Sequence, residues 1–151
     1  MKDVDKDGST DDDWRRANVD SVICNLYKAI QEVKPWVRFG MGIPGSWSMK
    51  SNAAAAYGIS LPAGISAMES YDYLYCNALE WVKQGWVDYL NPQIYWSTQV
   101  TRQNYRVLCN WWAKTVCENF SDKLSDGKRV HFFVSQAAYG ATDPSSGLSG
   151  Y

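Results

Sequence analysis

Apolar residues recur at helical spacing in three stretches of the chain. The stretches cover residues 13–33, residues 70–85, and the segment from Thr101 to the polar turn at residues 121–128. Apolar positions repeated at i, i+3 and i+4 are typical of a helix that buries one face, so the pattern predicts three amphipathic helices. The repeating positions of the first helix are Val19, Val22, Ile23, Leu26, Ile30 and Val33.

Three short runs rich in β-branched and aromatic residues alternate with these helices. They predict strands at residues 36–42, 87–96 and 130–138, with a long loop at residues 46–70. Strands separated by helices of this length pair in parallel, which predicts an α/β fold of about three βα units. Three parallel strands leave two unpaired sheet edges. The pattern therefore favours part of a (β/α)8 TIM barrel, to be completed by the remainder of the barrel or by self-association through these edges.

Composition and charge narrow the class of partner. The chain has 151 residues, 46% of them hydrophobic, which suits one globular domain. Lys and Arg number 15 against 16 Asp and Glu, so we expect no basic face for nucleic acid. No apolar run reaches the roughly 18 residues of a membrane helix, and the acidic start does not resemble a signal peptide.

Four cysteines lie within the predicted helices. They are Cys24, Cys76, Cys109 and Cys117, and their spacing matches no CxxC metal pair. We interpret them as reduced core residues, with a disulfide between two helices as the alternative.

Aromatic and amide residues gather where the three predicted strands end. The chain holds 8 Trp and 10 Tyr, more than a core of this size needs. Working groups of parallel α/β folds lie at the carboxyl ends of strands, and an aromatic ring beside an amide is suited to a sugar. The candidate saccharide-binding residues are Trp47, Asn91, Gln93, Tyr95, Trp96, Gln136 and Tyr139.

Strand alternation divides the second strand into two faces. Tyr89, Asn91, Gln93 and Tyr95 share one face, while Leu90, Ile94 and Trp96 share the other. We expect the polar face to line a barrel interior that opens to a cleft. The alternative is that Asn91 and Gln93 only satisfy backbone groups, and the argument for Asn91 is the weaker one.

The amino-terminal acidic run resembles a calcium loop of the EF-hand kind. Its candidate metal ligands are Asp3, Asp5, Asp7, Ser9 and Asp11. Trp14 stands where the loop needs a bidentate Glu, so a reduced Ca²⁺ affinity is expected. The alternative is a solvated acidic loop, and no cofactor is required.

Paired carboxylates for glycosidic cleavage are missing from the strand ends. Asp88 begins its strand, which predicts a structural role, and Glu69 and Asp143 are the only acids expected near the cleft. His131 is the only histidine, and it is interpreted as structural. The catalytic residues are therefore unknown.

Four segments and one tryptophan pair form a recognisable set. These are DWRRANV from Asp13, KPWVRFG from Lys34, WVDYLNPQIYW from Trp86 and QAAY from Gln136, with the Trp pair at residues 111–112. Together they resemble the glycosyl-hydrolase-like family 10 of bacterial (β/α)8-barrel proteins. By this resemblance the three strands correspond to the fifth, sixth and seventh of the barrel. The family's fourth-strand segment, rich in aspartate and aromatics, would precede DWRR, where this chain has only an acidic loop. The chain also has Gly42 and Ile43 where the family has a Ser-Pro pair.

The resemblance implies a bacterial glycan, such as a peptidoglycan strand, as substrate, and a place in the cell envelope or outside the cell. We expect an acidic loop at residues 1–12, a partial barrel at residues 13–140 and a flexible tail at residues 141–151. The expected function is that of a segment of a glycoside hydrolase, inactive alone, with at least one catalytic carboxylate supplied from outside this chain. The alternatives are a non-catalytic carbohydrate-binding protein and an inactive truncated gene product.

Overall fold

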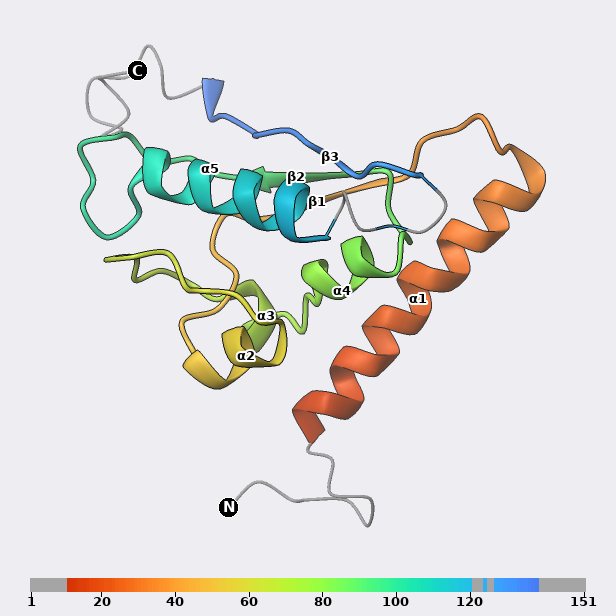
Figure 1. Ribbon diagram of the computed structural model, residues 1–151, viewed down its shortest axis with the longest axis horizontal. Helices are drawn as coiled ribbons and strands as arrows, with labels where there is room; N and C mark the ends of the chain where they lie inside the picture. Colours follow the sequence, from red (N-terminus) through yellow and green to blue (C-terminus); the bar gives the residue numbers. More distant parts are fainter. Residues whose placement is uncertain (1–10, 121–123, 125–126, 139–151) are drawn as a thin grey trace.

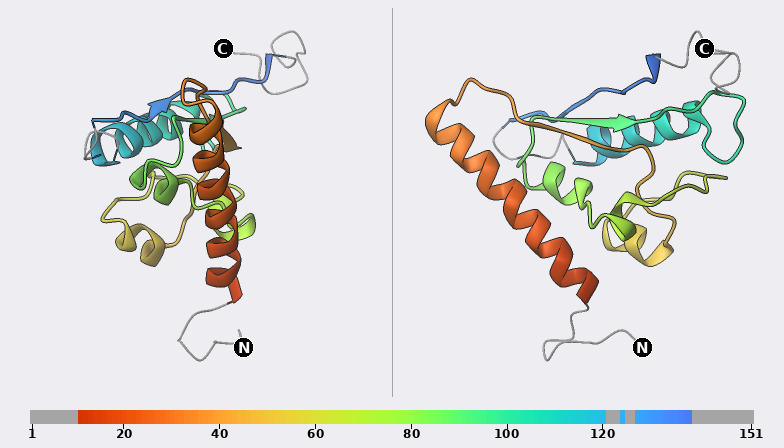
Figure 2. Two further views of the ribbon diagram at one scale, coloured as in Figure 1. Left: turned by 90° about the vertical axis from the view of Figure 1, so that its right-hand side faces the viewer. Right: turned by 180° about the vertical axis from the view of Figure 1, so that it is seen from behind.

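Three parallel strands form one sheet with all the helices on one side of it (Figures 1 and 2). The computed structural model describes residues 11–120, 124 and 127–138. The elements are α1 (Asp11–Val33), β1 (Gly40–Pro44), α2 (Ser51–Ala56), α3 (Ser70–Tyr73), α4 (Ala78–Lys83), β2 (Tyr89–Gln93), α5 (Tyr105–Ala113), the π-helix η1 (Lys114–Phe120) and β3 (His131–Phe132). The strand order is β1-β2-β3, so the expected fold class, about three βα units of a partial (β/α)8 barrel, is confirmed.

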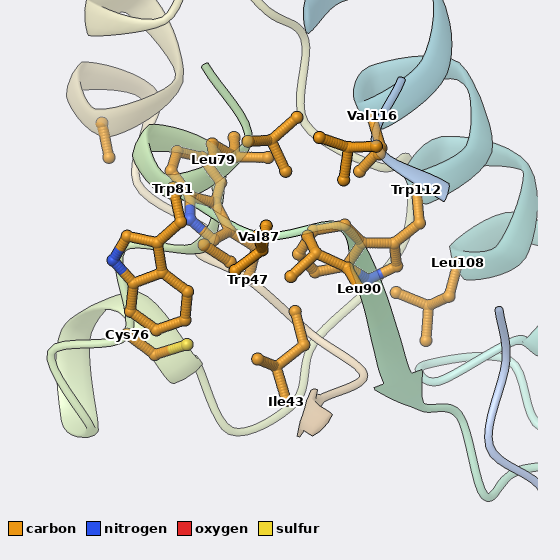
Figure 3. Packing of buried hydrophobic residues seen from close by; sticks show 14 of the residues in the cluster. Ile43, Trp47, Cys76, Leu79, Trp81, Val87, Leu90, Leu108, Trp112 and Val116 are labelled. Carbon is orange, nitrogen blue, oxygen red and sulfur yellow. The ribbon is translucent and has the colours of Figure 1, made fainter. Parts of the chain in front are cut away.

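The core fills the space between the sheet and the helices. Ile43 and Leu90 extend from the sheet toward Trp47, Trp81 and Trp112, and all five side chains are at most 2% exposed (Figure 3). The Trp112 indole also donates a hydrogen bond of 2.8 Å to the carbonyl of Gly45, which ties α5 to the end of β1.

A buried polar network attaches α1 to this core. One Asp20 carboxylate oxygen accepts a hydrogen bond from the indole of Trp81 at 2.6 Å, and the other accepts one from the amide of Asn77 at 2.9 Å. The Asn77 carbonyl oxygen accepts a further bond from the Tyr57 hydroxyl at 2.6 Å. Burial raises the pKa of Asp20, against the opposing effect of its two hydrogen bonds.

The predicted apolar face of α1 is only partly covered. Ile23 is buried, whereas Val22, Leu26 and Val33 are exposed, Val33 to 71%. A groove of about 290 Å³ follows this uncovered stripe. It is lined by Leu26, Ala29, Ile30, Val33, Lys34 and Val37.

Asp88 has the structural position that was expected of it. It accepts a hydrogen bond from the amide of Phe39 at 2.7 Å and lies 3.2 Å from the amine of Lys128, and it is buried. The Lys128 amine in turn donates to Tyr27 and to the carbonyl of Gly85. This network joins the amino-terminal edge of the sheet to α1 and to the end of α4.

Several predicted elements differ from those observed, and β2 and β3 are shorter than the predicted strands at residues 87–96 and 130–138. The first strand is Gly40–Pro44 instead of residues 36–42, because Trp36 lies in an exposed turn and pairing with β2 begins only at Gly40. The long loop at residues 46–70 contains a short helix, α2. The first helix, α1, begins at Asp11, two residues before the predicted start at residue 13.

The predicted helix at residues 70–85 is broken into α3 and α4. Tyr75 has a positive φ of 55°, and the amides of Leu74 and Cys76 both donate to the carbonyl of Ser70, which ends α3. Cys76 therefore lies between two helices and not within one. The break brings Asn77 to Asp20, whereas an uninterrupted helix would continue along its first axis.

The cysteines that can be placed are free thiols, as expected. Cys76 is buried, and Cys24 and Cys109 are partly buried. Within the described ranges, no helix is long and apolar enough to cross a membrane.

Candidate functional site

The sheet has one covered face and one open face. Leu90, Pro92 and Ile94 point toward the helices and are buried, whereas Tyr89 and Asn91 are half-buried and Gln93 is exposed. The predicted alternation along β2 is thus confirmed. The side-chain carbonyl oxygen of Asn91 is buried and has no hydrogen-bond partner among the residues described.

Two glycines of β1 provide space for the side chains of β2. Gly40 pairs with Tyr89, and a Cβ at Gly40 would lie 2.2 Å from the phenol ring, so the ring occupies that space. Gly42 lies beside the Gln93 amide nitrogen, 3.9 Å from where a Cβ would be. The Tyr89 ring also packs edge-to-face against the ring of Phe133, with the ring centroids 5.6 Å apart. The open face is therefore aromatic near the strand starts and amide-rich near the strand ends.

The carboxyl ends of β1 and β2 approach each other closely. A Cβ at Gly45 would lie 2.5 Å from the Gln93 carbonyl oxygen and 3.1 Å from the Trp96 ring. Tyr95 and Trp96 follow β2 at this edge and are both partly buried. Gln93, Tyr95 and Trp96 therefore lie at one end of the sheet, as the sequence predicted.

Gln136 extends the same edge beyond β3. It is exposed, and its side chain is hydrogen-bonded to the Tyr105 hydroxyl at the start of α5. Burial raises the pKa of Tyr105, against the opposing effect of its hydrogen bond with Gln136. Tyr105 is not among the candidate saccharide-binding residues that the sequence indicated. The signal in the sequence was Asn104, a capping residue that marks the start of α5. This helix begins beside the carboxyl ends of the strands.

Loop contacts hold this edge together. The amide of Ser66 donates to the carbonyl of Arg102 at 2.8 Å, and the Asn104 side chain donates to the carbonyl of Thr98 at 2.7 Å. The segment that follows β1 is thus joined to the segment that follows β2.

Trp47 does not lie at this edge, and its expected place in a sugar cleft is corrected. Its side chain is 1% exposed and packs against Tyr57, Tyr71 and Trp111, with ring centroids 5.1–6.0 Å apart. The chain turns toward the helices after β1, so the ring completes the core and offers no face to a sugar. Tyr139 lies outside the described residues.

Glu69 takes part in a carboxylate cluster that the sequence did not predict. It accepts a hydrogen bond of 2.8 Å from the amide of Met49, and the same carboxylate oxygen lies 3.3 Å from the hydroxyl oxygen of Ser48. The same hydroxyl donates to Asp72 at 2.7 Å, and Lys50 donates to Asp72 at 2.6 Å. Burial acts to raise the pKa of Asp72, but the hydrogen bonds from Lys50 and Ser48 outweigh it and lower that pKa. The cluster closes the loop after β1.

The calcium loop stays a prediction. Asp3, Asp5, Asp7 and Ser9 fall outside the described residues, and Asp11 is the first residue of α1. Among the residues that are described, no group of three or more His, Cys, Asp or Glu side chains is arranged to hold a metal. Asp143, the second acid expected near the cleft, also lies outside the described part.

Comparison with known proteins gives concordant matches. The model of the family Glycosyl hydrolase-like 10 matches residues 3–138. The chain is 35% identical over 128 residues to the glycosyl hydrolase YngK of Bacillus subtilis (strain 168), covering 85% of this chain and 22% of that protein. It is 32% identical over 133 residues to the glycosyl hydrolase DigH of Escherichia coli (strain K12), covering 88% of this chain and 27% of that protein. The chain thus spans about a quarter of the length of these relatives.

Proposed function

Since the chain belongs to the glycosyl hydrolase-like 10 family, we propose that it forms part of a (β/α)8-barrel glycoside hydrolase and supplies a saccharide-binding wall of its cleft. The observation that carries this proposal is the edge where β1, β2 and β3 end. Exposed amides at Gln93 and Gln136 lie there with the rings of Tyr95, Trp96 and Tyr105. Ring faces cover the C–H groups of a sugar, and amides exchange hydrogen bonds with its hydroxyl groups.

The catalytic carboxylates are proposed to come from other parts of the barrel. The segment after β2, residues 94–104, contains no Asp or Glu. Glu69 and Asp72 are engaged with Ser48, Met49 and Lys50. Hydrolysis of a glycosidic bond normally needs one carboxyl group as acid and a second as base or nucleophile. The role assigned to this chain is therefore to bind and orient the saccharide.

The substrate proposed is a bacterial glycan such as the strands of peptidoglycan. Support comes from family membership and from the exposed amides of the edge, which suit hydroxyl and acetamido groups. The Gln93 and Gln136 amides each offer both donors and an acceptor, whereas a phosphate ligand would call for several cations. A place in the bacterial envelope or outside the cell belongs to the same proposal.

The partner proposed for α1 is the part of the barrel that precedes it. Val22, Leu26 and Val33 are exposed on α1, the helix that leads into β1, the edge strand of the sheet. In a barrel α1 follows the strand next to β1, so that strand would pair the free backbone groups of β1, and the helix before that strand would cover the exposed stripe. One preceding segment of polypeptide would meet both needs.

A titration followed by NMR tests the saccharide wall. We expect an oligomer of N-acetylglucosamine to shift the side-chain amide signals of Gln93 and Gln136. The amide of Gln84 is the control, because it is exposed and donates a hydrogen bond to Glu80 on α4, away from the strand ends. Equal, small shifts at all three amides would contradict the proposal.

A second candidate function is that of a non-catalytic carbohydrate-binding protein, which would use the same edge of the sheet. The lack of Asp and Glu in residues 94–104 favours this function. Turnover separates the two functions. A complete barrel that contains this chain is expected to hydrolyse the glycan, whereas a binding protein would give the same NMR shifts without releasing product.

A further inference from the structure

Another hollow lies on the helix side of the molecule, between the segment after α2 and the α5–η1 helix. It has a volume of about 340 Å³. The residues that line it include Ile59, Ser60, Leu61, Trp111, Lys114 and Asn119. Neither the family match nor the open face of the sheet accounts for this groove.

The indole of Trp111 is fixed at the wall of the groove. One of its faces stacks on Trp47 at 6.0 Å with an angle of 25° between the planes. Its N–H donates a 2.6 Å hydrogen bond to the carbonyl of Ser60. The ring remains partly exposed in this orientation. Because the ring is already held, a ligand that packs on it would cause little further loss of side-chain entropy.

Two polar side chains border the same space. Lys114 is exposed and Asn119 is half-buried. Their places in the α5–η1 helix are next to Trp111, three and eight residues along the chain. A π-helix has a wider turn than an α-helix, and such segments occur frequently at functional sites. The amine and the amide supply donors and an acceptor beside the ring.

We propose that this groove binds one pyranose unit of a saccharide, at a position separate from the cleft edge. The ring of Trp111 with Ile59 and Leu61 offers apolar surface to sugar C–H groups, and Lys114 and Asn119 offer hydrogen bonds to hydroxyl or acetamido groups. The volume lies near the lower end of the roughly 300–1,000 Å³ of small-molecule pockets, which suits one sugar ring. A single lysine is too little cationic charge to favour a phosphorylated ligand.

The choice of a saccharide as the ligand rests on the proposed function, whereas the existence of the groove does not. A second contact on the same saccharide chain would raise the effective concentration of substrate near the cleft edge. The groove would then retain a long glycan between successive encounters at the cleft.

The test uses the full chain and two NMR signals in one titration with N-acetylglucosamine hexamer. The indole N–H of Trp111 reports on the groove, and the side-chain amide of Gln93 reports on the cleft edge. We expect Asn119→Ala and Lys114→Ala each to weaken the dissociation constant read from the Trp111 signal by about 3- to 10-fold. Lys28→Ala, an exposed change on α1, is the matched control and should leave that constant unchanged.

Each outcome decides between the two sites. A shift at Trp111 that becomes weaker in both groove variants supports saccharide binding in the groove, whether or not the Gln93 signal responds. If Gln93 does not respond, binding at the cleft edge alone is overturned. A shift at Gln93 alone would overturn the groove and leave the cleft edge standing. A Trp111 shift unchanged by both variants, or no shift at either signal, would also overturn the groove. Trp111→Phe, with its fold checked by its amide spectrum, is expected to bind more weakly than the wild-type chain when binding is followed in both by the side-chain amide signal of Asn119.

Discussion

Gly45 lies against the carbonyl group of Gln93, so closely that a Cβ at Gly45 would be 2.5 Å from the carbonyl oxygen. This contact sets how near the end of β1 comes to the end of β2. The exposed Gln93 side chain and the Trp96 ring are both next to it. The shape of the candidate cleft edge therefore depends on the absence of a side chain at residue 45.

Gly45→Ala is expected to lower the free energy of unfolding by about 1–3 kcal/mol, because the added methyl group overpacks against backbone. Gly42→Ala is the matched control. A Cβ there would lie 3.9 Å from the Gln93 amide nitrogen, an ordinary contact, so little change is expected. Urea unfolding measures both. Equal stability of the two variants would contradict the close packing at Gly45.

Asp20→Ala is expected to cost about 1–3 kcal/mol of unfolding free energy. The change leaves the indole N–H of Trp81 and the amide of Asn77 without their acceptor inside the protein. Thermal and urea unfolding give the loss. Glu32→Ala, an exposed acid at the far end of α1, serves as the control and should differ from wild type by at most about 0.5 kcal/mol. A similar loss in both variants would mean that the network does not fix α1.

The ion pair of Lys50 with Asp72 is expected to make stability sensitive to acid. The pKa of Asp72 is lowered in the folded chain, so its contribution is complete above the ordinary value of about 3.9 and is lost as the pH falls through the lowered value. Asp72→Asn removes this contribution. The difference in unfolding free energy between wild type and Asp72→Asn should therefore shrink from pH 6 toward pH 2. A difference that stays constant over this range would refute the assignment.

The uncovered stripe of α1 is expected to drive self-association of the isolated chain. Val33 is 71% exposed and Leu26 is 47% exposed. A buried Leu or Val side chain contributes roughly 1.5–3 kcal/mol, so Leu26→Glu should weaken the association constant by about tenfold or more. Sedimentation velocity measures the change, with Lys28→Glu as an exposed control on the same helix. A wild-type chain that stays monomeric at high concentration would contradict this prediction.

Sequence periodicity predicted the elements whose pattern is set by one packing face. The alternation at Leu90, Asn91 and Gln93 gave the two faces of β2 correctly, because a strand buried on one side has side chains of period two. The spacing from Val19 to Val33 likewise predicted α1. The spacing could not show which residues of the apolar stripe on α1 are buried within this chain, since their burial depends on neighbouring elements.

Local signals failed where long-range contacts decide the backbone. Tyr75 breaks the expected helix at a residue with no breaker signal in its side chain, and the break places Asn77 against Asp20. Trp47 follows a strand end, as a cleft residue would, yet the chain direction after Pro44 buries it. Neither turn can be inferred from residue type, because each depends on a partner distant in the sequence.

Catalysis in a complete barrel tests the central claim most directly. This chain would replace the aligned segment of the Bacillus subtilis glycosyl hydrolase YngK, and the rate of glycan hydrolysis would be measured for the hybrid protein. We expect hydrolysis by the hybrid, a loss of about tenfold in kcat/KM with Gln93→Ala, and no change with Gln84→Ala. A folded hybrid that hydrolyses the glycan equally well with Gln93→Ala and Gln136→Ala together would contradict the account.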